Sequence, residues 1–249
     1  NMKIIVTGGA GFIGSHLAEF LIKKGHKVII IDNLSTGRLN NIKSFKNKVR
    51  FIKADISELG KWTDNFKNAK IVFHLAALAD IVPSIQNPKE YFQSNVAGTE
   101  NIISASIKYK VKQVIYSASS SCYGIPKSYP TSETESIKPQ YPYALSKNLG
   151  EQILMHYAKV YGIKVTSFRL FNVYGTRSRT SGTYGAMFGV FLAQKLKGKP
   201  LTVVGDGNQK RDFTYVSDIV YAFYKAIRVK KNFKIFNLGT GRPTSVNSI

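Results

Sequence analysis

Cysteine, acidic residues and long apolar runs are all scarce in this sequence of 249 residues. A single cysteine, Cys122, excludes an intramolecular disulfide and fits a reducing compartment, so we expect a cytoplasmic protein. The four histidines, His16, His26, His74 and His156, show no zinc-ligand spacing, and no metal is expected. No apolar run approaches the ~20 residues of a membrane helix, so we expect no membrane partner.

The shortage of acidic residues gives the chain a strong positive charge. Against 36 Lys+Arg there are only 14 Asp+Glu, and the formal net charge is +22. Nucleic-acid binding through counterion release needs a continuous basic patch, but these cations are spread through every segment. We interpret them as solvated surface and expect no nucleic-acid partner. With 43% hydrophobic residues, the chain can bury a substantial core, which argues against disorder.

Short apolar runs alternate with helical stretches along the chain. Apolar residues recur at helical spacing over residues 12–24 and 187–196, and a further helix is predicted over 143–161. The β-rich runs predict strands at residues 3–7, 28–31, 49–53, 71–75, 113–117, 165–168, 201–204 and 234–237. Strands separated by helices form right-handed βαβ units. The pattern therefore predicts an α/β fold with a Rossmann-type doubly wound parallel sheet.

A glycine-rich loop with the sequence TGGAGFIG, residues 7–14, follows the first predicted strand and opens the first helix. Such glycines permit a tight turn and let a pyrophosphate approach the backbone at the helix N-terminus. Asp32 ends the second strand, where a carboxylate accepts hydrogen bonds from a ribose diol and repels a 2′-phosphate. The segment predicts a dinucleotide site that prefers NAD, and the alternative is a structural turn with a surface aspartate.

A Tyr and a Lys four residues apart share one helix face, where the ammonium lowers the pKa of the phenol and prepares a general base. Three pairs have this spacing: Tyr123/Lys127, Tyr143/Lys147 and Tyr221/Lys225. The first contains Gly124 and Pro126 and cannot be helical. The third lies late in the chain, away from the dinucleotide half. Only the second follows a strand that ends in polar residues, at the sheet edge that binds ligands.

The order of these segments resembles a known family, the extended short-chain dehydrogenase/reductases, and within it the NAD-dependent nucleotide-sugar epimerases and dehydratases. The resemblance covers essentially the whole chain and is greatest to the UDP-glucose and UDP-N-acetylglucosamine 4-epimerases. Matching stretches lie at residues 7–14, 32–37, 54–56, 74–77, 95–99, 117–124, 143–147, 169–172, 205–207 and 211–212.

The resemblance implies roles for particular residues. It implies Tyr143 as the base, Lys147 bridging ribose and phenolate, and Ser119 hydrogen-bonding the reacting sugar hydroxyl. It implies an NAD site formed by Gly8, Gly11, Phe12, Ile13, Gly14, Asp32, Asn33, Ser35, Thr36, Asp55, Ile56, Leu75, Ala76, Ala77, Asn95, Ser117, Tyr143, Lys147 and Leu170. The UDP-sugar substrate would meet Ser119, Ser120, Ser121, Asn172, Thr202, Val204 and Arg211.

Structural alternatives stay open for several of these residues. The serines at 119–121 can satisfy backbone groups at a strand end, and Asn95 can cap a helix start. Arg211 can be a surface cation, and Arg177 and Arg179 can either touch a ligand or be solvated. Cys122 is interpreted as a small buried residue rather than a nucleophile.

Departures from related subgroups favour one reaction. The dehydratases that this chain resembles carry Asp-Glu where it has Ser120-Ser121, and the decarboxylases carry Glu in place of Ser121. Without these carboxylates we expect NAD-dependent 4-epimerisation of a UDP-sugar through transient oxidation at C4′. The alternatives are a dehydratase, decarboxylase or ketosugar reductase of the same family, or a non-catalytic NAD-binding protein.

Glycines loosen the pattern after residue 172. We expect an NAD-binding Rossmann domain over residues 1–172 and a partial substrate-binding lobe over 173–249, interleaved with the last Rossmann elements. Residues 245–249 resemble the opening of another helix, so we expect this small lobe to be C-terminally incomplete. The resemblance also implies a homodimer, formed through the helix of Tyr143 and the one at residues 90–109.

Overall fold

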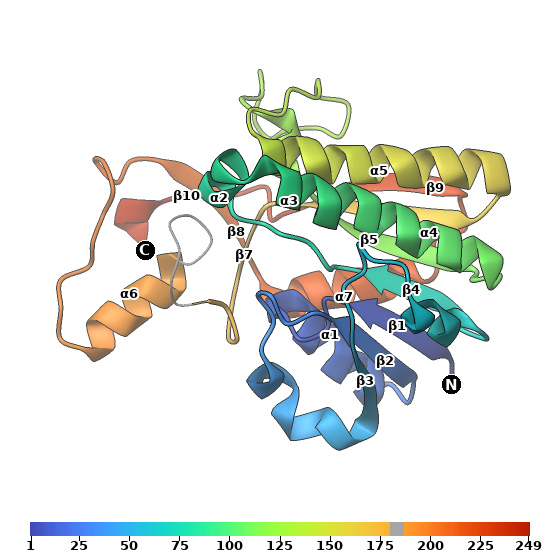
Figure 1. Ribbon diagram of the computed structural model, residues 1–249. Coiled ribbons are helices and arrows are strands. Elements are labelled where there is room, and N and C mark those ends of the chain that lie inside the picture. Colours follow the sequence, from blue (N-terminus) through green and yellow to red (C-terminus); the bar gives the residue numbers. More distant parts are fainter. Residues whose placement is uncertain (180–186) are drawn as a thin grey trace.

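The computed structural model describes residues 1–179 and 187–249, and its centre is a seven-stranded parallel sheet (Figure 1). The strands lie in the order β3-β2-β1-β4-β5-β6-β9. The chain first adds strands outward from β1 on one side and then, from β4 on, on the other side, as in a doubly wound sheet. The predicted fold class is confirmed. The strands are β1 (Lys3–Thr7), β2 (Lys27–Asp32), β3 (Val49–Lys53), β4 (Ile71–His74), β5 (Gln113–Ser119), β6 (Lys164–Leu170) and β9 (Phe233–Leu238).

Helices cover both faces of this sheet because its strands are apolar on both sides. Ile4 and Val6 of β1 pack in one core with helices α1 (Phe12–Lys23) and α7 (Val216–Ala226). Ile5, which lies between them in sequence and points to the opposite face, packs in a second core with α4 (Gly98–Lys108) and α5 (Pro142–Tyr161). Figure 1 shows α1 and α7 on one side of the sheet and α4 and α5 on the other.

The remaining elements extend this frame. Next to α4 the chain forms α2 (Ile81–Gln86), α3 (Pro88–Phe92) and a π-turn, η3 (Gln93–Ala97). Beyond the main sheet lie α6 (Met187–Leu196) and a small sheet in the order β10-β8-β7 (Figure 1). Its strands are β7 (Asn172–Tyr174), β8 (Lys210–Tyr215) and β10 (Pro243–Ser245), and the short 3-10 segments are η1 (Leu39–Lys48), η2 (Lys61–Phe66), η4 (Ser120–Tyr123) and η5 (Val246–Ser248).

One expectation about local structure was wrong. Residues 201–204 form no strand, because the Gln194 side chain pairs with this segment in place of a neighbouring strand. Gln194 Oε1 accepts the Thr202 N–H at 3.0 Å, and its Nε2 donates to Thr202 Oγ1 at 2.8 Å. At the end of the described chain, Val246–Ser248 forms one 3-10 turn.

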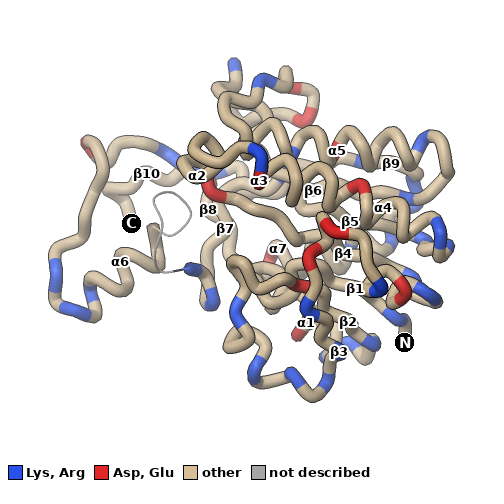
Figure 2. The backbone as a smooth tube through the Cα atoms, in the orientation of Figure 1, with Lys and Arg blue, Asp and Glu red and all other residues tan. Residues whose placement is uncertain are grey.

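Charged groups are distributed over most of the molecule. Figure 2 shows Lys and Arg on helices, loops and strand ends throughout the described chain. Over residues 1–179 and 187–249, no helix combines the length and the apolar character needed to cross a membrane.

Candidate active site

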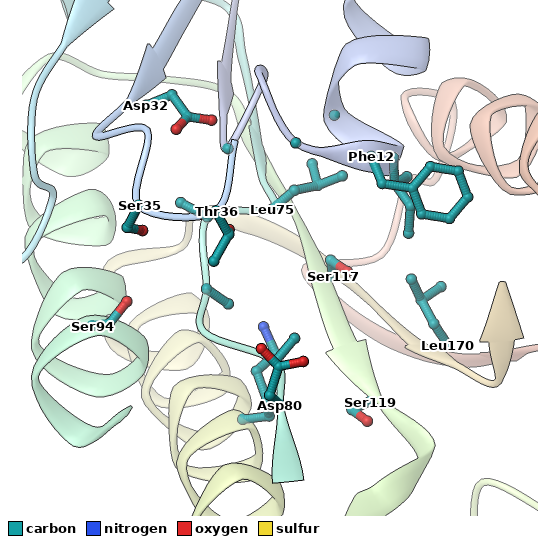
Figure 3. Close-up of a pocket in the computed structure, with 18 of the residues that line it drawn as sticks. Phe12, Asp32, Ser35, Thr36, Leu75, Asp80, Ser94, Ser117, Ser119 and Leu170 are labelled. Carbon is teal, nitrogen blue, oxygen red and sulfur yellow. The ribbon is translucent and has the colours of Figure 1, made fainter. Parts of the chain in front are cut away.

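A cavity of about 330 Å³ lies at the carboxyl edge of the main sheet, where β1, β2, β4, β5 and β6 end. Its size is within the range of small-molecule sites. The cavity is lined along one part by the glycine loop and Asp32 and along another by Ser119, Tyr143 and Lys147. Figure 3 shows Asp32 at one end and Ser119 at the other. The fold therefore brings both sequence motifs to one site.

The glycine loop has a shape that side chains would prevent. Gly8 has φ +69°, and a Cβ there would lie 2.7 Å from the Ala76 backbone nitrogen. A Cβ on Gly14 would collide with the Gly8 carbonyl oxygen. The glycines thus allow the start of α1 to approach β1 and β4 closely, which leaves the N-terminal N–H groups of the helix facing the cavity edge.

Asp32 is held rigidly at the end of β2. Its side chain is 6% exposed, its Oδ2 accepts the Ala10 N–H at 2.9 Å, and its Oδ1 accepts the Leu34 N–H at 2.8 Å. Burial raises the pKa of this carboxyl, and the two backbone donors oppose that rise. A fixed hydrogen-bond acceptor in this place fits the hydroxyls of a ribose.

Asn33 and Asp55 form the neighbouring part of the wall. Asn33 Nδ2 donates to Asp55 Oδ2 at 2.9 Å, and Ser57 donates to Asp55 Oδ1 through its backbone N–H and its hydroxyl. Burial acts to raise the pKa of Asp55, but the hydrogen bonds from Ser57 and Asn33 leave it below its ordinary value. The loops after β2 and β3 are therefore joined beside the cavity.

Tyr143 and Lys147 lie one turn apart at the start of α5 and both line the cavity. Burial raises the pKa of the Tyr143 phenol to about 12, while its interaction with the Ser119 hydroxyl opposes that rise. Lys147 is 4% exposed, and burial lowers its pKa to about 7 although Glu151 acts in the opposite direction. The Lys147 Nζ lies 4.3 Å from the centroid of the Tyr116 ring. Of the two groups, only Lys147 has a pKa near neutral, whereas burial keeps the Tyr143 phenol protonated there.

The three serines after β5 have different surroundings. Ser119 lines the cavity, and its hydroxyl also accepts the Ser121 N–H at 3.2 Å, so it is both a wall residue and a cap. Ser119 and Ser121 hydroxyls are 2.7 Å apart. Ser121 interacts with the Tyr141 phenol, and neither Ser120 nor Ser121 is part of the cavity wall.

Asn95 lies behind the wall rather than on it. It is 1% exposed and sits inside the π-turn η3, so it is not the helix-start cap considered from the sequence. Its Oδ1 accepts the Leu78 N–H at 2.8 Å, and its Nδ2 donates to the Leu78 carbonyl and to Ser146 Oγ, each at 2.9 Å. Asn95 thus ties the wall loop after β4 to helix α5.

The other residues assigned to the NAD site all line the cavity. Four of the predicted substrate residues, Asn172, Thr202, Val204 and Arg211, lie outside its wall. Val204 is 71% exposed, and the Arg211 guanidinium donates to the neighbouring Lys210 carbonyl. These residues belong to the region of β7, β8 and the segment after α6, which does not close over the cavity in the described part of the chain.

Nine wall residues were missed, and a tenth, Arg179, had been left open between ligand contact and solvation. Ile31, Ala54, Ala118 and Phe171 are sequence neighbours of predicted ones, so extending each motif by one residue would have found them. Asp80 and Arg179 come from loops without a motif and form an ion pair with a separation of 2.5 Å. The remainder are Ala79, Ser94, Val173 and Ser178.

Arg177 serves a different purpose from Arg179. It pairs with Glu19 of α1 at 2.5 Å, and the adjacent Thr176 carbonyl contacts His16 Nε2 at 2.9 Å. Arg177 therefore fixes the loop after β7 to α1, outside the cavity wall. In the parts of the chain that the structure describes, no group of three or more His, Cys, Asp or Glu side chains is placed to hold a metal ion.

Comparisons with known proteins agree with this site. The chain matches the NAD dependent epimerase/dehydratase family over residues 4–239. It is 41% identical over 250 residues to a putative UDP-glucose 4-epimerase of Methanocaldococcus jannaschii, covering 99% of this chain and 79% of the relative. It is also 36% identical over 253 residues to a UDP-N-acetyl-alpha-D-glucosaminuronate decarboxylase of Bacillus cytotoxicus, covering 99% and 78%.

The crystal structure of UDP-glucose 4-epimerase with UDP-glucose from Thermotoga maritima superposes with a TM-score of 0.93 at 39% identity, covering 99% of this chain and 80% of that one. The predicted family and its cofactor, NAD, are confirmed. The chain belongs to the NAD dependent epimerase/dehydratase family of extended short-chain dehydrogenase/reductases, enzymes that act on nucleotide sugars.

Proposed function

We propose that the protein is an NAD-dependent 4-epimerase of a UDP-sugar. One observation carries the proposal: Ser119, Tyr143 and Lys147 line the same cavity as the glycine loop and Asp32. A hydride acceptor and a general base would therefore meet at one sugar carbon. The similar proteins named as UDP-glucose 4-epimerases add support from comparison.

The NAD end of the cavity suits a dinucleotide. Gly8 and Gly14 leave room for a pyrophosphate beside the first turn of α1, and Asp32 offers a fixed carboxylate to a ribose diol. Asn33, Asp55 and Ile56 would surround the adenine. When bound, NAD supplies a hydride acceptor for C4′ of the sugar and a donor for the return of that hydride to the opposite face.

The other end suits the proton transfer. Tyr143 as a phenolate would accept the proton of the 4′-hydroxyl, and Ser119 would hydrogen-bond the same hydroxyl. Because burial raises the pKa of the phenol to about 12, a nearby cation is needed to form the phenolate at neutral pH. Lys147, when protonated, is placed one helical turn away to provide it. The proton that Tyr143 accepts would return to the 4′-oxygen when the 4-keto sugar is reduced.

The residues that differ from other family members favour epimerisation over elimination. A dehydratase needs an additional acid and base, but serines stand at positions 120 and 121. The one carboxylate in the wall near Tyr143, Asp80, is paired with Arg179. A second, unengaged acid is therefore missing from the described wall at this end.

The test is to incubate the protein with a panel of UDP-hexoses without added NAD and to read the C4′ configuration by NMR. Interconversion of one epimer pair without net NADH is the expected result. Accumulation of a 4-keto or decarboxylated product would instead assign the protein to another reaction of the family. Cofactor binding with no turnover of any sugar would leave a non-catalytic NAD-binding protein.

We further propose a division at residue 172, with residues 1–172 holding NAD and 173–249 forming part of a substrate lobe. Elements α7 and β9 of the second part belong to the main sheet and its helices, which fits interleaved units. Asn172, Thr202, Val204 and Arg211 would contact the nucleotide when the lobe approaches the cavity. A homodimer through α5 and cytoplasmic localisation remain predictions, tested by solution mass and by fractionation.

A further inference from the structure

The wall of the cavity contains an ion pair that the proposed chemistry does not use. Asp80 directly precedes α2, and Arg179 follows β7, ninety-nine residues later in the chain. The Arg179 Nη2 donates to Asp80 Oδ1 at 2.5 Å, and both side chains line the cavity. With exposures of 31% for Asp80 and 38% for Arg179, the pair is partly shielded from water. A charge brought into the cavity would therefore interact with it more strongly than with a surface pair.

The pair lies at the catalytic end of the cavity. Figure 3 shows Asp80 at the end where Ser119 lies, away from Asp32. The Asp80 N–H donates to the Tyr91 hydroxyl at 3.2 Å, and the Tyr91 ring packs edge-on against Tyr143 with centroids 6.5 Å apart. The charge of Asp80 is also one of the influences that raise the pKa of Tyr143. The Asp80 carboxylate thus acts electrostatically on the place where a sugar would react.

The chemistry of the sugar decides what this charge does. If C4′ lies at Tyr143, the substituent on C5′ begins only two bonds from the reacting carbon, because its carbon atom is C6′. In a UDP-hexose that substituent is a neutral hydroxymethyl group, whereas in a UDP-uronate it is a carboxylate. A uronate carboxylate would meet the Asp80 carboxylate, to which the Arg179 guanidinium already donates through Nη2. Like charges brought together in a partly dry site cost binding free energy.

We infer that the Asp80–Arg179 pair selects UDP-sugars with an uncharged C6′ group and disfavours UDP-uronates. This inference rests on the proposed function, since it assumes that C4′ of the sugar lies at Tyr143. Asp80 disfavours the uronate carboxylate, and Arg179 is the cation that would bind this carboxylate if Asp80 were neutral.

The test measures binding of UDP-glucose and UDP-glucuronate to the NAD-loaded protein by calorimetry. All variants carry Tyr143→Phe, so that binding is read without turnover. With Asp80 present, UDP-glucuronate should bind about tenfold more weakly than UDP-glucose or worse. Adding Asp80→Asn should lower the ratio of the two dissociation constants, UDP-glucuronate over UDP-glucose, by about tenfold, because Arg179 becomes free for the uronate carboxylate. Adding Arg179→Ala to Asp80→Asn should remove this gain.

Glu19→Gln is the matched control, because it removes the carboxylate from the other arginine pair of the same loop, outside the cavity. It should leave the ratio of the two affinities as it was. The inference would be overturned if both sugars bound equally well to the protein that retains Asp80. It would also be overturned if Asp80→Asn left the ratio of the two dissociation constants unchanged. A gain that survives Arg179→Ala would overturn it too. If the wild type epimerises UDP-glucose but the ratio does not respond, only this inference fails, whereas absence of turnover with every sugar defeats the proposed function.

Discussion

The two ends of the cavity are built in different ways. At the NAD end, the glycine loop and Asp32 come from one βαβ unit, and short-range backbone contacts hold them, such as the Asp32 bonds to Ala10 and Leu34. At the catalytic end, Ser119, Tyr143, Asp80 and Arg179 come from four segments far apart in the chain. One end is therefore specified by local sequence, and the other by how distant segments meet.

This difference separates two kinds of function. The local end presents backbone shape and one carboxylate, which under the proposed function would recognise a cofactor common to many reactions. The composite end presents titratable side chains whose pKa values depend on burial and on neighbours from other elements, as those of Tyr143 and Lys147 do. Substitutions at the two ends should consequently have separable effects on cofactor binding and on turnover.

Tyr143→Phe should have the largest effect, and only at the catalytic end. Loss of the phenol oxygen removes the proposed base, so turnover of the UDP-sugar should fall about 10²- to 10⁴-fold. NAD content, measured after denaturing the purified protein, should stay the same because the glycine loop and Asp32 are untouched. Near-normal turnover in this variant would show that Tyr143 is not the base.

Gly8→Ala should damage the NAD end instead. Its φ of +69° and the Ala76 backbone 2.7 Å from the new Cβ combine strain with a clash, so we expect destabilisation of about 2–4 kcal/mol and loss of NAD. Thermal unfolding and cofactor content measure both.

Gly25→Ala is the control for backbone conformation alone. Gly25 has a φ of +80°, but a Cβ there would meet nothing within 4 Å. We expect a loss of about 1 kcal/mol and no change in NAD content. Equal losses in the two variants would mean that conformational strain, and not close approach to Ala76, makes Gly8 necessary.

The same contrast explains how far the sequence could predict the molecule. Apolar runs located all seven main-sheet strands, and the glycine loop with Asp32 located one end of the cavity, because each depends on neighbours in sequence. Asp80 could not be found and the role of Arg179 could not be decided, since their pairing exists only after α2 and the loop after β7 come together. The strand expected at residues 201–204 failed for a related reason: a side chain from α6, Gln194, takes its hydrogen bonds. Asn95 matched a motif, yet only the fold shows that it supports the wall from behind.

Lys147→Met should reveal how much the buried Lys147 cation lowers the free energy of unfolding, and this effect should depend on pH. Burial lowers the pKa of Lys147 from 10.5 to about 7. Below about pH 7 the lysine is protonated in both the folded and the unfolded protein, so the folded protein bears the full cost of a buried cation. Between about pH 7 and 10.5 the unfolded chain binds more protons, so wild-type stability from this residue rises with pH.

The methionine variant lacks this titration. In the NAD-free protein it should exceed the wild type in free energy of unfolding by on the order of 2–4 kcal/mol at or below neutral pH, and the difference should shrink toward pH 10.5. Urea unfolding at several pH values measures it. A difference that is constant with pH would mean that Lys147 is not a buried cation.

Asp32→Asn should have a small effect on affinity and test which part of the cofactor the local end recognises. An amide can accept only one of the two backbone hydrogen bonds from Ala10 and Leu34, and it no longer repels a 2′-phosphate. We expect NAD affinity to fall about tenfold, or ~1.4 kcal/mol, while NADP affinity falls less. Titration of the stripped protein with each cofactor gives both values, with Asp64→Asn as a control outside the cavity. If the preference for NAD over NADP stayed unchanged, the charge of Asp32 would not be the basis of selection, and the backbone shape around the glycine loop would have to supply it.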